Sequence, residues 1–367
     1  MLKKFLVFCN IFLGILFVWG SYLQYFNPAS WWFLGLLAIA LPYILFLLVL
    51  FFVYWLLSKK IWLLISLLVI GLTLKTVESI FPWHFTASFN IKKDPHSIRV
   101  MSWNVEQFTI LQYKTHPEIK QQMLDLINQY QPDIACFQEM VAGDNRKAIN
   151  NLGDFQKRLQ FLDYFYSYDT KMDYDADHHF GIIVFSKFPI INKQTITHFP
   201  NDYNSTFQYA DIIVNNDTVR VVNIHLQTLR FTSNNLQYLD DPIKSDSDLS
   251  KSKSILKKLK TGFLKRAVQA QNIKSEIDKS IYPVIVCGDF NDVPNSYAYS
   301  LIGEGLQNAF VKKGFGFGRT FSGISPTLRI DNIFADKKFA IHQFTRIPKK
   351  LSDHFPVIAD LSLDHQP

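Results

Sequence analysis

Six short polar signatures follow one another between residues 102 and 354, and their side chains are of the kinds that bind metal ions and phosphates. In chain order they are Ser102-Trp103-Asn104-Val105-Glu106, Cys136-Phe137-Gln138-Glu139, Asn223-Ile224-His225-Leu226, Gly288-Asp289-Phe290-Asn291, Arg329-Ile330-Asp331 and Ser352-Asp353-His354. Most of them follow or end an apolar run that is typical of a buried strand, which brings polar side chains to one edge of a sheet. Such oxygen-rich clusters suit Mg²⁺ and phosphate better than zinc or a covalent nucleophile. The signatures therefore predict hydrolysis of a phosphoester.

Hydrolysis of a phosphoester needs a cation on the phosphate oxygens, a base for the attacking water, and donors for the charge that develops. Glu139 ends a strand-like run and is the best candidate for a metal ligand. Glu106 lies two residues past Asn104, so on an extended segment it would point the same way and add a second oxygen. The alternative for each glutamate is an exposed loop carboxylate without a function.

Asp289 and Asn291 also lie two residues apart, and an extended backbone would present both side chains on one face. The carboxylate can act as the base or position the water, and the amide can donate to a phosphate oxygen. The alternative for Gly-Asp-Phe-Asn is an Asx turn at the end of a strand. Because the apolar run 283–287 precedes it, we expect this segment at a carboxyl-terminal strand edge, where α/β sheets bind their ligands.

Two histidines are candidates for proton transfer or for holding the phosphate. His225 ends a strand-like run, where a single histidine is more often structural than catalytic. His354 is better supported, because a carboxylate nearby would orient its ring and keep it protonated. Asp331 is the expected partner of His354, which leaves Asp353 free to bind the metal. Asn223, in the strand that ends at His225, is a further candidate for substrate binding.

This ordered set resembles the endonuclease/exonuclease/phosphatase superfamily of metal-dependent phosphoesterases, over about Ile98 to Leu363. The residues that match the motifs of that superfamily are Asn104, Glu139, His225, Asp289, Asn291, Asp331, Asp353 and His354. The resemblance implies a four-layer α/β sandwich, with two facing sheets and helices outside. It also implies Mg²⁺ or Mn²⁺ as the cofactor, and inversion at phosphorus by a water that attacks in line.

The chain departs from the superfamily's pattern at two positions. Relatives often have Asp or Gln two residues after the first Asn, where this chain has Glu106. The nucleolytic branches often have a phosphate-contacting Tyr upstream of Gly181, and His179 stands at the matching position, beside His178 and behind the acidic stretch 173–177. His179 could still donate to a phosphate, although the change weakens an assignment as a repair nuclease.

Alternating strand-like and helical segments position these signatures and predict an α/β fold. We expect a helix over Pro117–Tyr130 and another over Arg146–Leu162, with Asn215-Asn216-Asp217 as a hairpin turn. The expected strands are Ile98–Met101, Asp133–Phe137, Gly181–Phe185, Ala210–Val214, Val219–His225, Val284–Cys287 and Leu328–Phe334.

Three apolar runs precede this region, at about residues 5–26, 31–57 and 61–80, and two of them exceed the ~20 residues needed to cross a bilayer. The third has Lys75 and Glu78 near its end, but these could reach the interface, so we expect three spans. A cleaved signal peptide is the alternative for the first run, but no small-residue cleavage pattern clearly ends it. Lys3-Lys4 and Lys59-Lys60 place the N-terminus and the second turn in the cytoplasm by the positive-inside rule. Three spans then put the catalytic domain on the non-cytoplasmic side of an inner or plasma membrane. If the third run does not span, the domain would instead be cytoplasmic.

The expected organisation is a membrane region over 1–83, a linker over 84–97 and a catalytic domain over 98–364. The membrane region contains five lysines and one glutamate, a net +4, which leaves only +3 of the chain's +7 for the rest. This small excess argues against a nonspecific DNA-binding protein. Cys9, Cys136 and Cys287 lack metal-ligand spacing and are expected to be buried apolar residues.

One segment, Arg230–Lys260, is rich in Ser, Asp, Asn and Lys and is expected to be an exposed insertion. Residues 249–266 contain seven basic residues and no acid, on a helix that continues to about Lys279. The pattern favours a solvated amphipathic helix over an electropositive rim for phosphates or anionic membranes. The expected inward positions are Ile255, Leu256, Leu259, Phe263 and Leu264.

The function expected from these features is a membrane-anchored, metal-dependent phosphodiesterase acting on nucleic acid, a phospholipid or a nucleotide. No obligate protein partner is evident. A binding or signalling protein that keeps the fold without catalysis is the alternative, although such a protein would be expected to lose part of the site.

Overall fold

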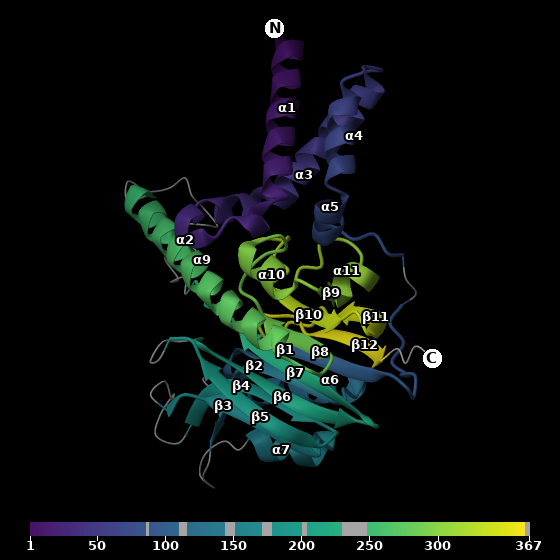
Figure 1. Ribbon diagram of the computed structural model, residues 1–367, viewed down its shortest axis with the longest axis vertical. Coiled ribbons are helices and arrows are strands. Elements are labelled where there is room, and N and C mark those ends of the chain that lie inside the picture. The colour runs from purple at the N-terminus through teal and green to yellow at the C-terminus, as the bar shows by residue number, and fades with distance from the viewer. Residues whose placement is uncertain are drawn as a thin grey trace.

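Two six-stranded sheets form the centre of the computed structural model (Figure 1). The structure describes residues 1–85, 88–109, 116–143, 151–170, 178–199, 204–229 and 248–363. In the first sheet the strand order is β11-β12-β1-β2-β4-β3, and only β1 and β2 pair in parallel. Its strands are β1 (Ile98–Asn104), β2 (Ile134–Gly143), β3 (Asp163–Tyr168), β4 (His178–Ser186), β11 (Phe339–Arg346) and β12 (Val357–Leu363).

The second sheet repeats this plan with the order β5-β6-β7-β8-β10-β9. Its strands are β5 (Ile190–Thr197), β6 (Thr206–Val214), β7 (Asp217–His225), β8 (Val284–Asp289), β9 (Leu306–Asn308) and β10 (Asp331–Asp336). Here β7 and β8 are the parallel pair, and His225 lies opposite Asp289 in their register. The carboxyl ends of two central strands therefore place a histidine and an aspartate side by side.

Three apolar clusters hold the layers together. One lies between the sheets and includes Val100, Cys136, Val221 and Cys287. The second packs the outer face of the first sheet against α6 (Pro117–Tyr130) and α7 (Asn151–Leu159). The third packs the outer face of the second sheet against α9 (Asp248–Asp278) and α10 (Tyr297–Ile302), and a short helix, α11 (Ala309–Lys313), follows β9. The expected four-layer α/β sandwich is confirmed.

The predicted elements agree best where the sequence pattern is strongest. The helix over Pro117–Tyr130 has the predicted bounds, and residues 215 and 216 form the turn of the β6–β7 hairpin, in which Val214 pairs with Asp217. The predicted strands are present but longer, whereas the strand expected over Leu328–Phe334 begins only at Asp331. Of the helix predicted over Arg146–Leu162, residues 146–150 lie outside the described residues, and α7 ends at Leu159.

Strands β3, β5, β9, β11 and β12 were not predicted. In β5 the side chains are mostly exposed or half-buried, because this strand is at the edge of its sheet. Such a strand lacks the apolar run that marks a buried one.

Two N-terminal helices are long and apolar enough to cross a membrane, α1 (Leu2–Gly20) and α3 (Leu34–Leu57). The short helices η1 (Leu23–Tyr25) and α2 (Pro28–Trp31) connect them. The third apolar run is not one continuous helix as predicted, since α4 (Leu63–Leu72) and α5 (Leu74–Ile80) are bent by 82° at Thr73. Thr73 leaves the helical conformation at φ −118° and ψ 26°, and its hydroxyl bonds the carbonyl of Val69. A third crossing therefore exists only if the bent pair counts as one span.

The two ends of these helices differ in chemistry. The N-terminus of α1 and the turn between α3 and α4 lie at the end away from the sheets (Figure 1), and that end carries Lys3, Lys4, Lys59 and Lys60. The connection between α1 and α3 lies at the near end and is rich in exposed aromatic side chains. These are Tyr22, Tyr25, Trp31 and Phe33, with Trp19 at the end of α1.

The near end of the helices is packed onto the sandwich. Val293, from the loop after β8, belongs to the same buried cluster as Phe17, Leu34 and Val77. Arg329, just before β10, is 1% exposed and donates hydrogen bonds to the carbonyls of Ser79 and Ile80, the last residues of α5.

Candidate functional site

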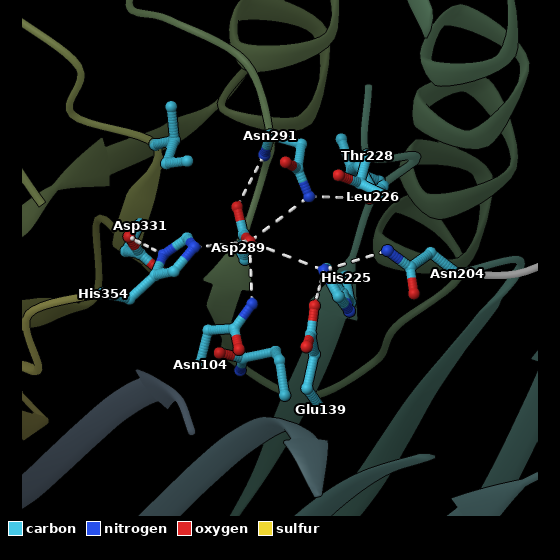
Figure 2. A network of polar contacts seen from close by, with 12 residues as sticks. Asn104, Glu139, Asn204, His225, Leu226, Thr228, Asp289, Asn291, Asp331 and His354 are labelled. Carbon is cyan, nitrogen blue, oxygen red and sulfur yellow. Dashed lines mark hydrogen bonds and ion pairs between the residues drawn. The ribbon is translucent and has the colours of Figure 1, made fainter. Parts of the chain in front are cut away.

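Asp289 is the centre of the polar network at the carboxyl ends of β7 and β8 (Figure 2). Its side chain is 1% exposed, and its Oδ2 accepts hydrogen bonds from the amides of Asn104 at 3.1 Å and Asn291 at 3.2 Å. Gly288 lets the strands approach closely here, because a Cβ at this position would lie 2.0 Å from the carbonyl oxygen of Ile224. The predicted site residues Asn104, Asp289 and Asn291 are thus in direct contact.

His354 approaches the same carboxylate from the β10 side. Its Nε2 lies 3.7 Å from Oδ2 of Asp289, and its Nδ1 lies 2.9 Å from Oδ2 of Asp331, so the predicted pair of Asp331 and His354 is formed. Burial alone lowers the pKa of His354, but the charges of Asp331 and Asp289 and the hydrogen bond that the ring donates to Asp331 raise it well above the usual value. The ring is therefore a cation held between two carboxylates.

His225 approaches Asp289 from the other side. Its Nε2 lies 3.5 Å from Oδ2 of Asp289 and 3.7 Å from Oε1 of Glu139. The closest polar neighbour is the side-chain amide of Asn204, at 3.1 Å. Burial raises the pKa of Asp289, but the charge of His354 and the hydrogen bond and charge of His225 outweigh it, so the net shift is downward. A buried base is kept ionised in this way.

Glu106, Glu139 and Asp353 form a second, more open part of the site. The backbone N–H of Asp353 donates to Oε2 of Glu106 at 3.0 Å. Burial raises the pKa of Glu106, and the charge of Asp353 raises it further. Burial also raises the pKa of Glu139, to which Asp353 and Asp289 contribute and which His225 opposes.

The raised pKa values of Glu106 and Glu139 indicate that the charges of His225 and His354 do not offset the burial and mutual repulsion of these carboxylates, and a divalent cation would supply the missing positive charge. Three carboxylates are also the donor set that Mg²⁺ and Mn²⁺ prefer. The predicted ligands Glu106, Glu139 and Asp353 therefore fit a hard divalent cation.

Another group of possible ligands is tighter. Among the described residues, Asp289, Asp331 and His354 each offer an atom within 4.8 Å of the other two. His354 binds Asp331 through Nδ1, and its raised pKa favours the protonated ring, which cannot bind a metal. We therefore assign this group to proton and phosphate chemistry.

Backbone strain gathers at the site. Glu106, Glu139 and Asn291 all have positive φ, at 47°, 54° and 48°. Non-glycine residues adopt this conformation rarely and at a cost, and such residues cluster at functional sites. Glu139 is in a bulge of β2, where the register with β4 shifts between Phe137 and Met140. The bulge turns the glutamate out of the strand pattern and toward His225.

Two local conformations differ from prediction. Glu106 is not on an extended segment, because β1 ends at Asn104 and a 3₁₀ turn, η2 (Glu106–Thr109), begins. Asn291 is not extended either: its N–H donates to Oδ1 of Asp289 at 2.8 Å, which makes the Asx turn that was the alternative. Its side-chain amide donates to Asp289 and to the carbonyl of Leu226 at 3.0 Å. The extended backbone predicted at both positions was wrong, yet both side chains reach the site.

Asn223 and His179 lie outside this network. Asn223 is fully buried between the sheets, where its amide donates to the carbonyls of Phe137 and Ile183 and its oxygen accepts from Gln138. These hydrogen bonds join Asn223 of the second sheet to residues of the first, which indicates a structural role. The ring of His179 stacks on Tyr168 at 4.1 Å, and Tyr168 lines a cavity beside His225. The acidic stretch 173–177 lies outside the described residues.

Residues that support the site were missed in the sequence. Gln269 of α9 donates to the carbonyl of Asn204 at 2.8 Å and accepts from the N–H of Gln227 at 2.9 Å. Arg266, also on α9, pairs with Asp292 at 3.1 Å, both of them buried. One turn of α9 thus holds both the loop after β7 and the loop after β8. Arg266 stood within the basic run of this helix, but nothing in the sequence indicated its partner.

Comparisons with known proteins agree with this geometry. The model of the Endonuclease/Exonuclease/phosphatase family matches residues 101–354, and the model of a domain of unknown function matches residues 3–80. No curated protein matches the chain.

Similar solved structures have low sequence identity. The human Nocturnin catalytic domain with bound sulfate has a TM-score of 0.51 at 18% identity, over 74% of this chain and 97% of that one. A family protein from Leptotrichia buccalis has a TM-score of 0.50 at 16% identity, over 72% of this chain and 100% of that one. A humanized D. rerio TDP2 has a TM-score of 0.50 at 16% identity, over 73% and 99%. At these identities the likeness shows the fold.

Proposed function

Because the chain belongs to the Endonuclease/Exonuclease/phosphatase family, we propose that it is a membrane-anchored, metal-dependent phosphodiesterase. Its substrate contains a phosphate ester, in a nucleic acid, a phospholipid or a nucleotide, and no protein partner is required. One observation carries the proposal: the buried Asp289, whose pKa is lowered, lies between two histidines and beside carboxylates whose pKa values are raised.

Each residue of the network has a proposed role in this reaction. Asp289 holds the attacking water and takes its proton, since its lowered pKa keeps it ionised at neutral pH. His354, held by Asp331, donates to the phosphate oxygen that gains charge. Asn104 and Asn291 fix the Asp289 carboxylate and are close enough to donate to the substrate. His225 faces the same carboxylate from the opposite side and limits where the water can lie.

Glu139, Glu106 and Asp353 would hold Mg²⁺ or Mn²⁺. When bound, the cation neutralises the phosphate oxygens and stabilises the charge of the transition state. Both glutamates have positive φ, and in these conformations Glu139 lies 3.7 Å from His225 and Glu106 accepts the N–H of Asp353.

The proposal is tested with the full chain in nanodiscs, a generic soluble phosphodiester and Mg²⁺ or Mn²⁺. We expect metal-dependent hydrolysis, and His354→Ala should abolish it. Undiminished turnover in His354→Ala would overturn the assigned roles. Calorimetry of metal binding is the second measurement: metal binding without hydrolysis of any ester would indicate a binding protein that keeps the fold.

We further propose that the helices cross the plasma or inner membrane several times, with the catalytic domain on the non-cytoplasmic side. Helix α1 begins at the lysine-bearing end and finishes next to the sandwich (Figure 1), so a single crossing by α1 already separates the domain from Lys3 and Lys4. The side of the membrane on which the catalytic domain lies thus depends less on the bent α4–α5 pair than the sequence indicated. Protection of the domain from protease added outside intact cells would contradict this topology.

A further inference from the structure

The end of the membrane helices next to the catalytic domain has the chemistry of a bilayer interface. Tyr22, Tyr25, Trp31 and Phe33 are between 43% and 73% exposed in the connection between α1 and α3. Trp and Tyr concentrate at the level of lipid headgroups, where one part of the ring is apolar and another is wet. With the lysines at the opposite end, this connection marks the near surface of the bilayer.

The first half of α9 lies against this connection. Phe263 packs on Gly35, where an added Cβ would lie 2.7 Å from its ring, and the ammonium of Lys260 lies 5.3 Å over the ring of Trp32. Figure 1 shows the N-terminal end of α9 rising from the sandwich to the level of α2 and the end of α1. One helix therefore runs from the outer layer of the catalytic domain to the bilayer surface.

The basic residues at the two ends of α9 differ in whether they form ion pairs. Beyond residue 265, Arg266 pairs with Asp292, Lys274 with Asp278 and Lys279 with Glu276. In the first half, Lys253 and Lys257 are exposed and form no ion pair with any residue that the structure describes. Because residues 249–266 contain no acid, an anionic partner must come from outside this segment.

We propose that residues 252–260 of α9, together with Trp31 and Trp32, bind the anionic headgroups of the leaflet in which α1 ends. This surface, here named the leaflet surface, goes beyond the proposed hydrolysis and depends only on insertion of the helices. Lysines at the level of interfacial aromatic residues are the arrangement that attracts anionic lipids. Leu256, 42% exposed between Lys253 and Lys257, is placed to enter the boundary between headgroups and acyl chains. The sequence pattern of α9 favoured a solvated helix. The packing of α9 on the α1–α3 connection instead favours contact with the bilayer.

The test uses the full chain with Cys9→Ser, labelled at Leu256→Cys with a fluorophore that a spin-labelled lipid quenches. Cys136 and Cys287 are buried and are not expected to react. The protein is placed in nanodiscs of phosphatidylcholine, alone or mixed with phosphatidylglycerol, and the spin label is carried in turn by each lipid. We expect stronger quenching by labelled phosphatidylglycerol than by labelled phosphatidylcholine, and loss of this difference in Lys253→Glu/Lys257→Glu and in high salt.

A matched control is Lys279→Glu, one residue past the other end of α9, which should leave the quenching unchanged. Equal quenching by the two lipids, or a difference that survives the double charge reversal, would overturn the proposal. Binding of single-stranded DNA that the double variant loses, without a lipid effect, would replace it with a nucleic-acid surface. Hydrolysis of the soluble phosphodiester should be the same in all these variants, so failure of the leaflet surface and failure of the catalytic assignment are told apart.

Discussion

His354 and His225 approach the same oxygen of Asp289 from opposite sides, yet their surroundings differ (Figure 2). Both are nearly fully buried, at 4% and 3% exposure. His354 has a carboxylate of its own, Asp331, at hydrogen-bond distance, whereas the nearest polar group to His225 is the amide of Asn204. The cavity beside the site is lined by His225 and Asn204.

This difference separates two tasks. A buried imidazole keeps its proton only if carboxylates offset the loss of hydration, and His354 has two of them nearby. His225 also faces two carboxylates, Asp289 at 3.5 Å and Glu139 at 3.7 Å, but its hydrogen bond is with the amide of Asn204, which fixes the direction of the ring without adding charge. We therefore expect the His354 side to supply charge to the reaction and the His225 side to supply position.

Removal of the carboxylate that both histidines face should have the largest effect. Asp289→Asn keeps the size of the side chain but cannot accept the proton of the water, so kcat should fall by roughly 10³-fold or more. Steady-state kinetics on the soluble phosphodiester, with thermal unfolding as a control of folding, measures it. A loss below about tenfold would mean that the two histidines do not share a catalytic carboxylate.

The next largest effect is expected at the partner of His354. Asp331→Asn removes a charge that raises the pKa of His354, so the imidazolium should lose its proton at a lower pH. If the cation is required, activity is lost as pH rises through this pKa, and the variant's alkaline limb should move to lower pH. Profiles of kcat/KM against pH would show the move, and an unchanged limb would argue that another group sets it.

Replacement of each histidine by glutamine should have a smaller effect, and its size should differ between His354 and His225. His354→Gln should lower kcat by roughly 10²-fold, as expected for loss of a charged donor, and His225→Gln by roughly tenfold. The amide of glutamine can replace a positioning hydrogen bond but not a charge. Equal losses of kcat in the two variants would contradict the different roles expected for His354 and His225.

A third histidine, the half-buried His198, shows what burial does to the pKa of a ring when no carboxylate contributes to the shift. His198 stacks on Phe207, and burial lowers its pKa from 6.5 to about 4. Because the unfolded chain takes up a proton near pH 6.5 and the folded one only near pH 4, His198 should destabilise the fold progressively as pH falls across this window. Denaturant unfolding between pH 7 and about 4 should show a shallower loss of stability in His198→Phe. The same slope in both proteins would mean that burial alone does not set the charge of these rings.

Most of the site residues predicted from the sequence lie together in the structure, because the strand ends carry their polar residues in recognisable order. The sequence predicted neither the bulge that aims Glu139 nor the 3₁₀ turn at Glu106, since both depend on pairing with distant segments. The buried link from Gln138 to Asn223 joins two sheets and has no local pattern. Polar residues inside apolar strand runs were its only signal, and they were taken for site residues. The break at Thr73 was equally hidden, because apolar composition continues on both sides of it.

Arg329 gives the membrane helices a place in the architecture of the catalytic domain. Its guanidinium has no carboxylate partner among the described residues, and besides the carbonyls of α5 it bonds the carbonyl of Phe317 and stacks on Phe310. It stands two residues before Asp331, so the last turn of α5 helps to fix the start of the strand that carries this carboxylate. A shortened chain beginning after α5 would keep all six signatures but would leave the buried guanidinium of Arg329 without the two carbonyl acceptors that α5 supplies. Weak activity in such a fragment would therefore be a consequence of the missing helix. Activity should be measured with the N-terminal helices present.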